Sequence, residues 1–145
     1  MSFNYDGLEF RTRLVARWAA FFDLAQWTWH TNAAPIGDWT PDFLVSFPCG
    51  HSECRDEHRL LVSVLPVDNI DSVAGHPALQ HRYSVEDHTG RSRADAGAIF
   101  GASPLVSKWE MAHGAGGGIS AVPEWVINHH ELWVLAGGFV NAQEP

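Results

Sequence analysis

Cysteine is scarce in this chain, because Cys49 and Cys54 are the only two among 145 residues. Two cysteines in a chain of this size do not make a disulfide framework, so we expect reduced thiols. Long apolar runs are also missing: no stretch of 18 apolar residues occurs, and residues 1–10 carry neither a basic region nor an apolar stretch. These absences predict an intracellular protein with no signal peptide and no membrane span.

Basic residues are few as well. Lysine and arginine together number 9, against 17 aspartate and glutamate residues, and the formal net charge is −8. Proteins that grip nucleic acid usually carry a basic patch, so we do not expect this chain to bind nucleic acid directly. An acidic chain is better suited to a partner protein that is itself basic.

The length of the chain and its 46% hydrophobic content predict a single domain over residues 1–145. Periodicity and turn residues then predict the elements. Helices are expected at 8–25, around 77–79, at 92–100 and at 123–136, and strands at 27–30, 39–47, 59–65 and 109–112. The glycine-rich segment 114–118 is expected to be a loop. This order of elements indicates an α+β (mixed α/β) domain rather than a doubly wound fold.

The core is predicted from two of these elements. Trp18, Phe21 and Phe22 share one face of the first helix, which predicts that this face packs on a sheet. The run at 59–65 is mostly apolar, as is typical of a central strand with both faces covered. We therefore expect the three strands at 27–30, 39–47 and 59–65 to share one sheet, with buried side chains at Phe43, Leu61, Val62 and Val64.

Four strings stand in a particular order along the chain. They are FRTRLVARWAAFFD at 10–23, TPDF at 40–43, LLVSVLP at 60–66 and ELWVLAGGFVNAQ at 131–143. Together they resemble the small PD-(D/E)xK nuclease-like proteins of phages and mobile elements. The resemblance implies a restriction-endonuclease-like sheet flanked by helices.

Most catalytic positions of that family pattern hold other residues here. The family binds Mg²⁺ through carboxylates on its first helix and two strands, and a lysine follows two residues after the last acid. Asp42 matches the Pro-Asp aspartate, whereas the remaining positions are Val15, Ser63 and Leu65. One carboxylate is a poor Mg²⁺ site, so the resemblance implies a degenerate nuclease. Asp42 would be catalytic, with Mg²⁺ as cofactor, only if activity is retained; otherwise the Pro-Asp pair marks the start of a strand.

A second candidate site is a group of metal-ligating residues close together in the sequence: Cys49, His51, Cys54 and His58. Cysteine and histidine are good zinc ligands, and four of them complete a tetrahedron. The spacing is not that of a standard zinc finger, and Cys49 and His51 reach one ion only through a tight turn, which Gly50 permits. A solvated loop without a cofactor is therefore the main expectation, with a structural zinc and a local disulfide as alternatives.

Three hypotheses about function follow. In the first, the chain is a non-catalytic phage or mobile-element protein that binds another protein in the cytoplasm of a bacterial host. Its partner would be a basic nucleic-acid-handling complex of a host defence system, such as a CRISPR effector, which it would inhibit. In the second, the chain is a divergent Mg²⁺-dependent DNA nuclease that uses Asp42. In the third, it is a structural or accessory protein of a phage particle. The net charge and the degenerate positions favour the first hypothesis.

Overall fold

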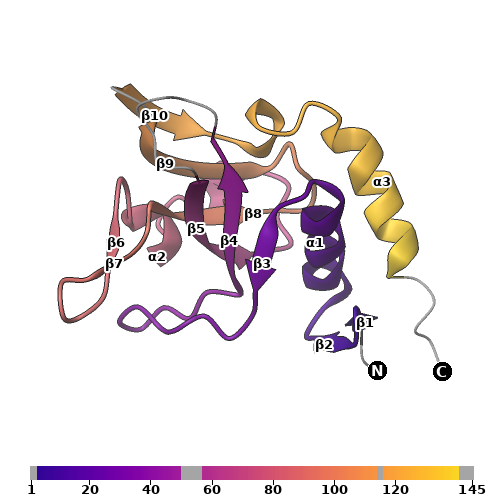
Figure 1. Ribbon diagram of the computed structural model, residues 1–145, viewed down its shortest axis with the longest axis horizontal. Coiled ribbons are helices and arrows are strands. Elements are labelled where there is room, and N and C mark those ends of the chain that lie inside the picture. The colour runs from indigo at the N-terminus through magenta and orange to yellow at the C-terminus, as the bar shows by residue number, and fades with distance from the viewer. Residues whose placement is uncertain (1–2, 50–56, 114–115, 141–145) are drawn as a thin grey trace.

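A six-stranded sheet forms the centre of the computed structural model, which describes residues 3–49, 57–113 and 116–140. Its strands are β3 (Thr28–His30), β4 (Phe43–Pro48), β5 (Glu57–Val64), β8 (Ala96–Phe100), β9 (Ser107–His113) and β10 (Gly116–Ser120). They stand in the order β10-β9-β8-β5-β4-β3 (Figure 1). β5 and β8 run parallel, and the other neighbouring pairs are antiparallel. The expected α+β class is confirmed.

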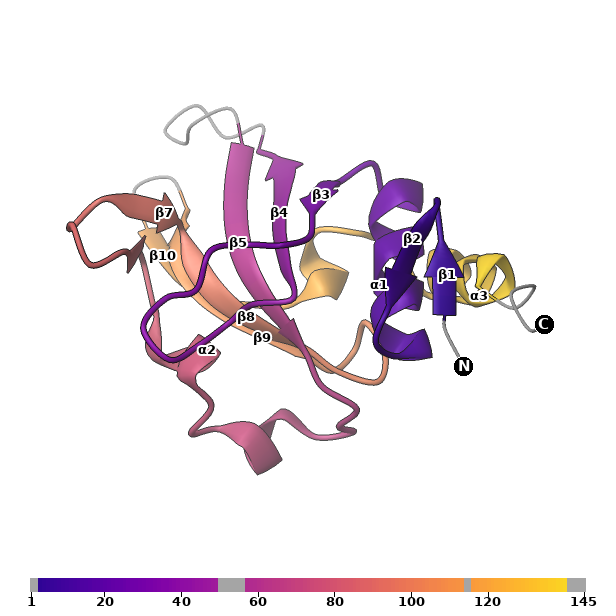
Figure 2. The same ribbon diagram turned by 90° about the horizontal axis from the view of Figure 1, so that it is seen from below.

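Helices lie on both sides of this sheet. On one side α1 (Arg13–Leu24) packs on the sheet and α3 (His129–Phe139) packs against α1, whereas α2 (Pro77–Gln80) lies on the opposite side (Figure 2). Trp18, Phe21 and Phe22 of α1 are fully buried against the sheet, as predicted. A smaller cluster that includes Ile36 and Leu61 fills the opposite face. None of the helices in the described ranges is long and apolar enough to cross a membrane.

The remaining short elements form two hairpins and two 3-10 turns outside the central sheet. β1 (Phe3–Tyr5) pairs with β2 (Leu8–Phe10), and β6 (Val85–Glu86) pairs with β7 (Ser92–Ala94). Two 3-10 turns, η1 (Ile70–Val73) and η2 (Val122–Glu124), lie in connections.

The three strands predicted in the first half of the chain share one sheet. β5 pairs with β4 on one side and with β8 on the other, as expected for a central strand. The side chains predicted to be buried are at most 3% exposed: Phe43, Leu61, Val62 and Val64. The shared sheet and the buried side chains are therefore confirmed, but the strand predicted at 39–47 begins only at Phe43, so the Pro-Asp pair precedes β4.

The first helix begins later than the sequence predicts. Residues Leu8–Phe10 form β2, because Asp6 and Gly7 have φ of 53° and 77°, the left-handed pair that a tight hairpin turn requires. α1 then begins after Thr12, whose hydroxyl oxygen accepts a hydrogen bond from the Val15 N–H at 3.2 Å.

The helix predicted at 92–100 is wrong, since that segment forms β7 and β8. Ser92 as a cap and Gly101 as a stop suggested the helix, but β8 pairs with β5 and β9 instead. A Cβ atom on Gly97 would lie 2.3 Å from the Ala78 carbonyl oxygen, so α2 packs directly on the backbone of β8. Glycine is needed at that position to admit α2.

Two expectations for the last third of the chain also differ from the structure. Gly116–Ser120 form β10, so the loop prediction is wrong for that part of the glycine-rich segment, while residues 114–115 lie outside the described ranges. The strand expected at 109–112 is confirmed within β9. The helix expected at 123–136 is instead the turn η2 followed by α3.

α3 also runs on past the two glycines that were expected to stop it. Arg17 of α1 approaches one of these glycines closely. A Cβ atom on Gly137 would lie 3.0 Å from the Arg17 guanidinium carbon, and this guanidinium donates two hydrogen bonds, at 2.7 and 3.0 Å, to the Trp133 carbonyl oxygen. Gly137 therefore serves helix packing rather than helix termination.

Candidate functional site

Asp42, the one matching residue of the nuclease pattern, stands immediately before β4 and is held from two directions. Its Oδ1 accepts from Arg11 Nε at 3.1 Å, and its Oδ2 accepts from Arg11 Nη2 at 2.9 Å and from the Val64 N–H at 2.8 Å. The side chain is only 18% exposed. Both carboxylate oxygens are thus engaged in contacts that join the β2–α1 connection to the end of β5.

The other positions of the pattern carry no metal-ligating group. Val15 is buried in the core beneath α1, and Leu65 is half-buried beyond the end of β5. Ser63 is buried and accepts a hydrogen bond from Trp39 Nε1 at 2.7 Å. Asp42 does lie beside this end of β5, as the pattern requires. However, no group of three or more histidine, cysteine or carboxylate ligands surrounds it within the described ranges.

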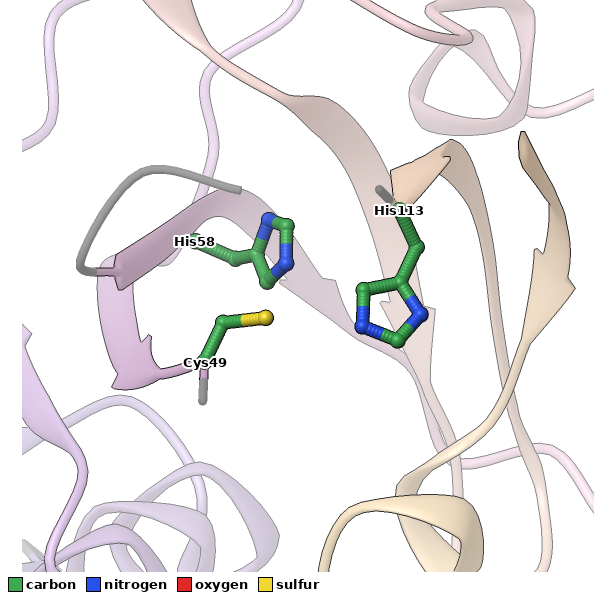
Figure 3. A group of neighbouring side chains, drawn as sticks. All are labelled: Cys49, His58 and His113. Atoms are coloured by element: carbon green, nitrogen blue, oxygen red, sulfur yellow. The ribbon is translucent and has the colours of Figure 1, made fainter. Parts of the chain in front are cut away.

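A different set of side chains does converge, at the opposite end of β5. Cys49 directly follows β4, His58 is the second residue of β5, and His113 ends β9. One ligand atom from each of the three lies within 4.8 Å of the others. Figure 3 shows the thiol and the two imidazole rings directed at a common point. Three strands thus bring together three residues of the types that bind zinc.

The spacing of these atoms is close to that of a filled zinc site. Atoms bound tetrahedrally to one zinc ion at about 2.1–2.3 Å lie roughly 3.4–3.6 Å apart. The separations in the cluster, at 4.8 Å or less, need to close by at most about 1.4 Å to reach that spacing. The cluster therefore lies within about 1.4 Å of the spacing of a filled site.

His58 is oriented for metal binding by a neighbouring carboxylate. Its Nδ1 lies 3.4 Å from Asp95 Oδ2, which also accepts from the Arg59 N–H at 2.8 Å. The other ring nitrogen, Nε2, is buried and has no hydrogen-bond partner among the described residues. A carboxylate behind a histidine whose second nitrogen faces the ion is the usual arrangement at zinc centres. Such a carboxylate fixes the tautomer that leaves the Nε2 lone pair available.

Burial lowers the pKa of His58 below its usual value, against the opposing influence of Asp95. The neutral imidazole, which is the form that binds a metal ion, is therefore favoured at neutral pH. Asp95 is itself fixed by its own N–H, which donates to the Arg59 carbonyl oxygen at 2.8 Å. The carboxylate that orients His58 thus belongs to the frame of the sheet.

Aromatic rings enclose the cluster on the core side. The Trp125 ring lies 5.5 Å from the His58 ring and 5.1 Å from the His113 ring, between centroids. Phe47 lies 5.6 Å from His58 and 4.9 Å from Trp125. These rings limit the freedom of both imidazoles and exclude water from one side of the cluster.

The sequence identified this centre in part. Cys49 and His58 were predicted zinc ligands and do lie together, whereas His51 and Cys54 lie outside the described residues. His113 was missed because nothing in the local spacing links it to the other two. The predicted strand at 109–112 stopped one residue short of it, and only the pairing order of β5, β8 and β9 brings it near.

Comparison of the chain with protein-family models, with curated proteins and with solved structures finds no match.

Proposed function

We propose that this chain is a non-catalytic binding protein whose sheet is fastened at one end by a zinc ion. One observation carries the proposal. Cys49, His58 and His113 converge from three strands, and the buried His58 ring presents an Nε2 atom without a partner among the described residues. A buried polar nitrogen left without a hydrogen bond is costly, and a bound metal ion removes that cost.

The ligand types select the metal. A thiolate with two imidazoles suits zinc, while Mg²⁺ takes oxygen ligands and keeps several waters. Asp42 offers a carboxylate, but Arg11 and the Val64 N–H already occupy both of its oxygens. These contacts support a structural role for Asp42, and they argue against Mg²⁺ chemistry at this carboxylate.

A structural role for the zinc ion is favoured over a hydrolytic one. A catalytic zinc keeps an open position that faces a substrate cleft. Here Trp125 and Phe47 cover the core side of the cluster, and pockets of substrate size lie elsewhere, beside Arg59, Lys108 and Trp29. The sequence supplies two candidates for the one further ligand that completes a tetrahedron, His51 and Cys54, in the segment between β4 and β5.

Elemental analysis of protein purified without chelator tests the zinc centre. We expect about one equivalent of zinc, lost in Cys49→Ser and in His58→Asn. The matched control is His130→Asn, because His130 is exposed on α3 and remote from the cluster in sequence. Wild-type protein that carries no zinc and does not take it up in an equilibrium titration would contradict the proposal. Zinc that is retained in both cluster variants would contradict it equally.

The partner we propose is a basic, nucleic-acid-handling protein of a host defence system, such as a CRISPR effector, which this chain inhibits. The net charge of −8 supports this, because complementary charge accelerates encounter and fixes orientation. α3 adds an apolar contact surface, since Val134, Leu135 and Phe139 are each more than half exposed.

Capture from host cells followed by salt titration tests this partner class. Binding to a basic channel weakens steeply between low and high salt and is competed by DNA or guide RNA. A Leu135→Glu variant should bind less well if α3 is the contact surface, whereas His130→Asn should bind as wild type. A captured partner that is acidic, or a virion protein whose binding ignores both salt and nucleic acid, would refute the inhibitor proposal.

A further inference from the structure

A cavity of about 260 Å³ lies on the face of β5 opposite the cysteine–histidine cluster. Successive side chains of a strand point to opposite faces, so His58 faces one site and Arg59 the other. The wall of the cavity is apolar and is formed by Ile36, Leu44 and Leu61. Its rim is basic, because Arg59 of β5 and Arg91 and Arg93 of the β6–β7 hairpin line it together.

Three guanidinium groups around one cavity are unusual for so acidic a chain. They make up three of its 9 basic residues, while the net charge is −8. Arg93 pairs with Asp87, with Nε 3.2 Å from Oδ2. Neither Arg59 nor Arg91 has a carboxylate partner among the described residues. Arg59 and Arg91 therefore keep guanidinium groups that are available to pair with a bound anion.

The backbone around the cavity is held in place before any ligand arrives. The Arg59 N–H donates to Asp95 Oδ2 and the Arg59 carbonyl oxygen accepts from the Asp95 N–H, both at 2.8 Å. On the other side, Asp87 Oδ1 accepts from the Arg91 N–H at 3.1 Å and stabilises the hairpin tip. The two arginines without partners therefore stand on fixed elements that face each other across the cavity. Such preorganisation reduces the entropy lost on binding.

We propose that this cavity binds a small organic oxyanion, in which one phosphate or carboxylate group is attached to a compact apolar body. The guanidinium fork matches both anionic groups with paired hydrogen bonds. Ile36, Leu44 and Leu61 provide the apolar surface for the remainder of the ligand. The cavity is slightly smaller than the roughly 300 Å³ at which drug-sized sites begin, which limits the ligand to about one ring.

Isothermal titration calorimetry with four probes tests the proposal: phenyl phosphate, benzoate, inorganic phosphate and benzyl alcohol. We expect phenyl phosphate, benzoate or both to bind at least about tenfold more tightly than inorganic phosphate and benzyl alcohol, because those two lack the apolar body and the charge respectively. Tight binding of phenyl phosphate alone would assign a phosphate ester as the ligand. Tight binding of benzoate alone would assign a carboxylate.

Variants locate the site. Arg59→Gln and Arg91→Gln should each weaken binding about tenfold or more, because each removes a charged donor. Arg13→Gln is the matched control, since Arg13 is an exposed arginine on α1. Arg91 lies on an exposed hairpin, so its variant decides the question even if Arg59→Gln fails to fold. The proposal is wrong if no probe binds at millimolar concentration, if benzyl alcohol binds as well as the anions, or if Arg91→Gln binds like wild type.

The cavity and the zinc centre use different side chains on opposite faces of β5, so the two proposals fail independently. Protein that binds no zinc but takes up phenyl phosphate would leave the anion site standing. Protein that holds one equivalent of zinc and binds none of the probes would remove the anion site alone.

Discussion

Replacement of Asp42 by alanine distinguishes a catalytic aspartate from a structural one. In the structure the carboxylate accepts two hydrogen bonds from Arg11 and one from the Val64 N–H. The substitution removes all three and leaves the Val64 N–H without its acceptor at the end of a central strand. We therefore expect Asp42→Ala to destabilise the fold and to have no catalytic activity to remove.

The contacts set the size of the effect. A hydrogen bond from a part-buried N–H to a carboxylate contributes about 1.5–3 kcal/mol. Arg11 is 53% exposed, so its ion pair adds only about 0–1 kcal/mol. The loss in unfolding free energy should therefore be about 2–3 kcal/mol. For a domain of this size that corresponds to a fall in Tm of about 5–10 °C.

Thermal unfolding and a cleavage assay give the two readouts. Arg11→Ala should cost less, about 1–2 kcal/mol, because it removes the ion pair and the hydrogen bond from Arg11 Nη2 to the Val64 carbonyl oxygen at 3.0 Å but leaves the Val64 N–H bonded to Asp42. Asp38→Ala is the matched control, since Asp38 is exposed. With Mg²⁺ or Mn²⁺ present, neither wild type nor variants should cleave single- or double-stranded DNA or RNA. Metal-dependent cleavage that disappears in a stably folded Asp42→Ala protein would refute the structural interpretation and restore the nuclease hypothesis.

Three further changes test other parts of the structure. Asp95→Asn should weaken zinc affinity about 10- to 100-fold in a chelator competition, because it removes the charge behind the imidazole. Gly97→Ala should destabilise the fold by about 2 kcal/mol or more, since its Cβ would lie 2.3 Å from a backbone oxygen; Gly75→Ala, where nothing lies within 4 Å, should not. Burial lowers the pKa of His76, whose Nδ1 accepts from the Ala78 N–H at 3.1 Å. As the pH falls, the unfolded chain therefore takes up a proton on His76 before the folded chain does. The hydrogen bond from the Ala78 N–H to His76 thus contributes its full stability above about pH 6.5, and this stability is lost as the pH falls below that value. His76→Asn should flatten this dependence in urea titrations.

The sequence predicts those helices and strands whose own residue pattern shows which of their faces are buried. The aromatic residues of the first helix lie along one face, which predicts one buried face, and the apolar run at 59–65 predicts a strand buried on both faces. Small residues are ambiguous by comparison. Gly97 indicates no particular element by itself, and only the close packing of α2 on β8 explains why glycine stands there. That packing is a long-range property and leaves no local period in the sequence.

The candidate site was likewise predicted only for the ligands that lie close together in the sequence. Cys49 and His58 stand close together in the sequence, so spacing alone placed both in one metal-binding hypothesis. His113 joins them through the pairing of β8 with both β5 and β9, which no spacing rule reveals. Arg11 was expected within a helix and instead precedes it, and from there it pairs with Asp42. In each case the missing information is which strands become neighbours.

The two ends of β5 have separate roles that cannot merge into one active site. Asp42 meets β5 at Val64, whereas the cysteine–histidine cluster meets it at His58. Six residues of extended strand separate these points by roughly 20 Å, at about 3.3 Å per residue. A single metal ion binds ligands within about 2.5 Å, so the cluster cannot supply the ligands that are missing around Asp42. Any zinc held near His58 therefore lies too far away to be bound by Asp42, and the two ends of β5 must be tested by separate variants.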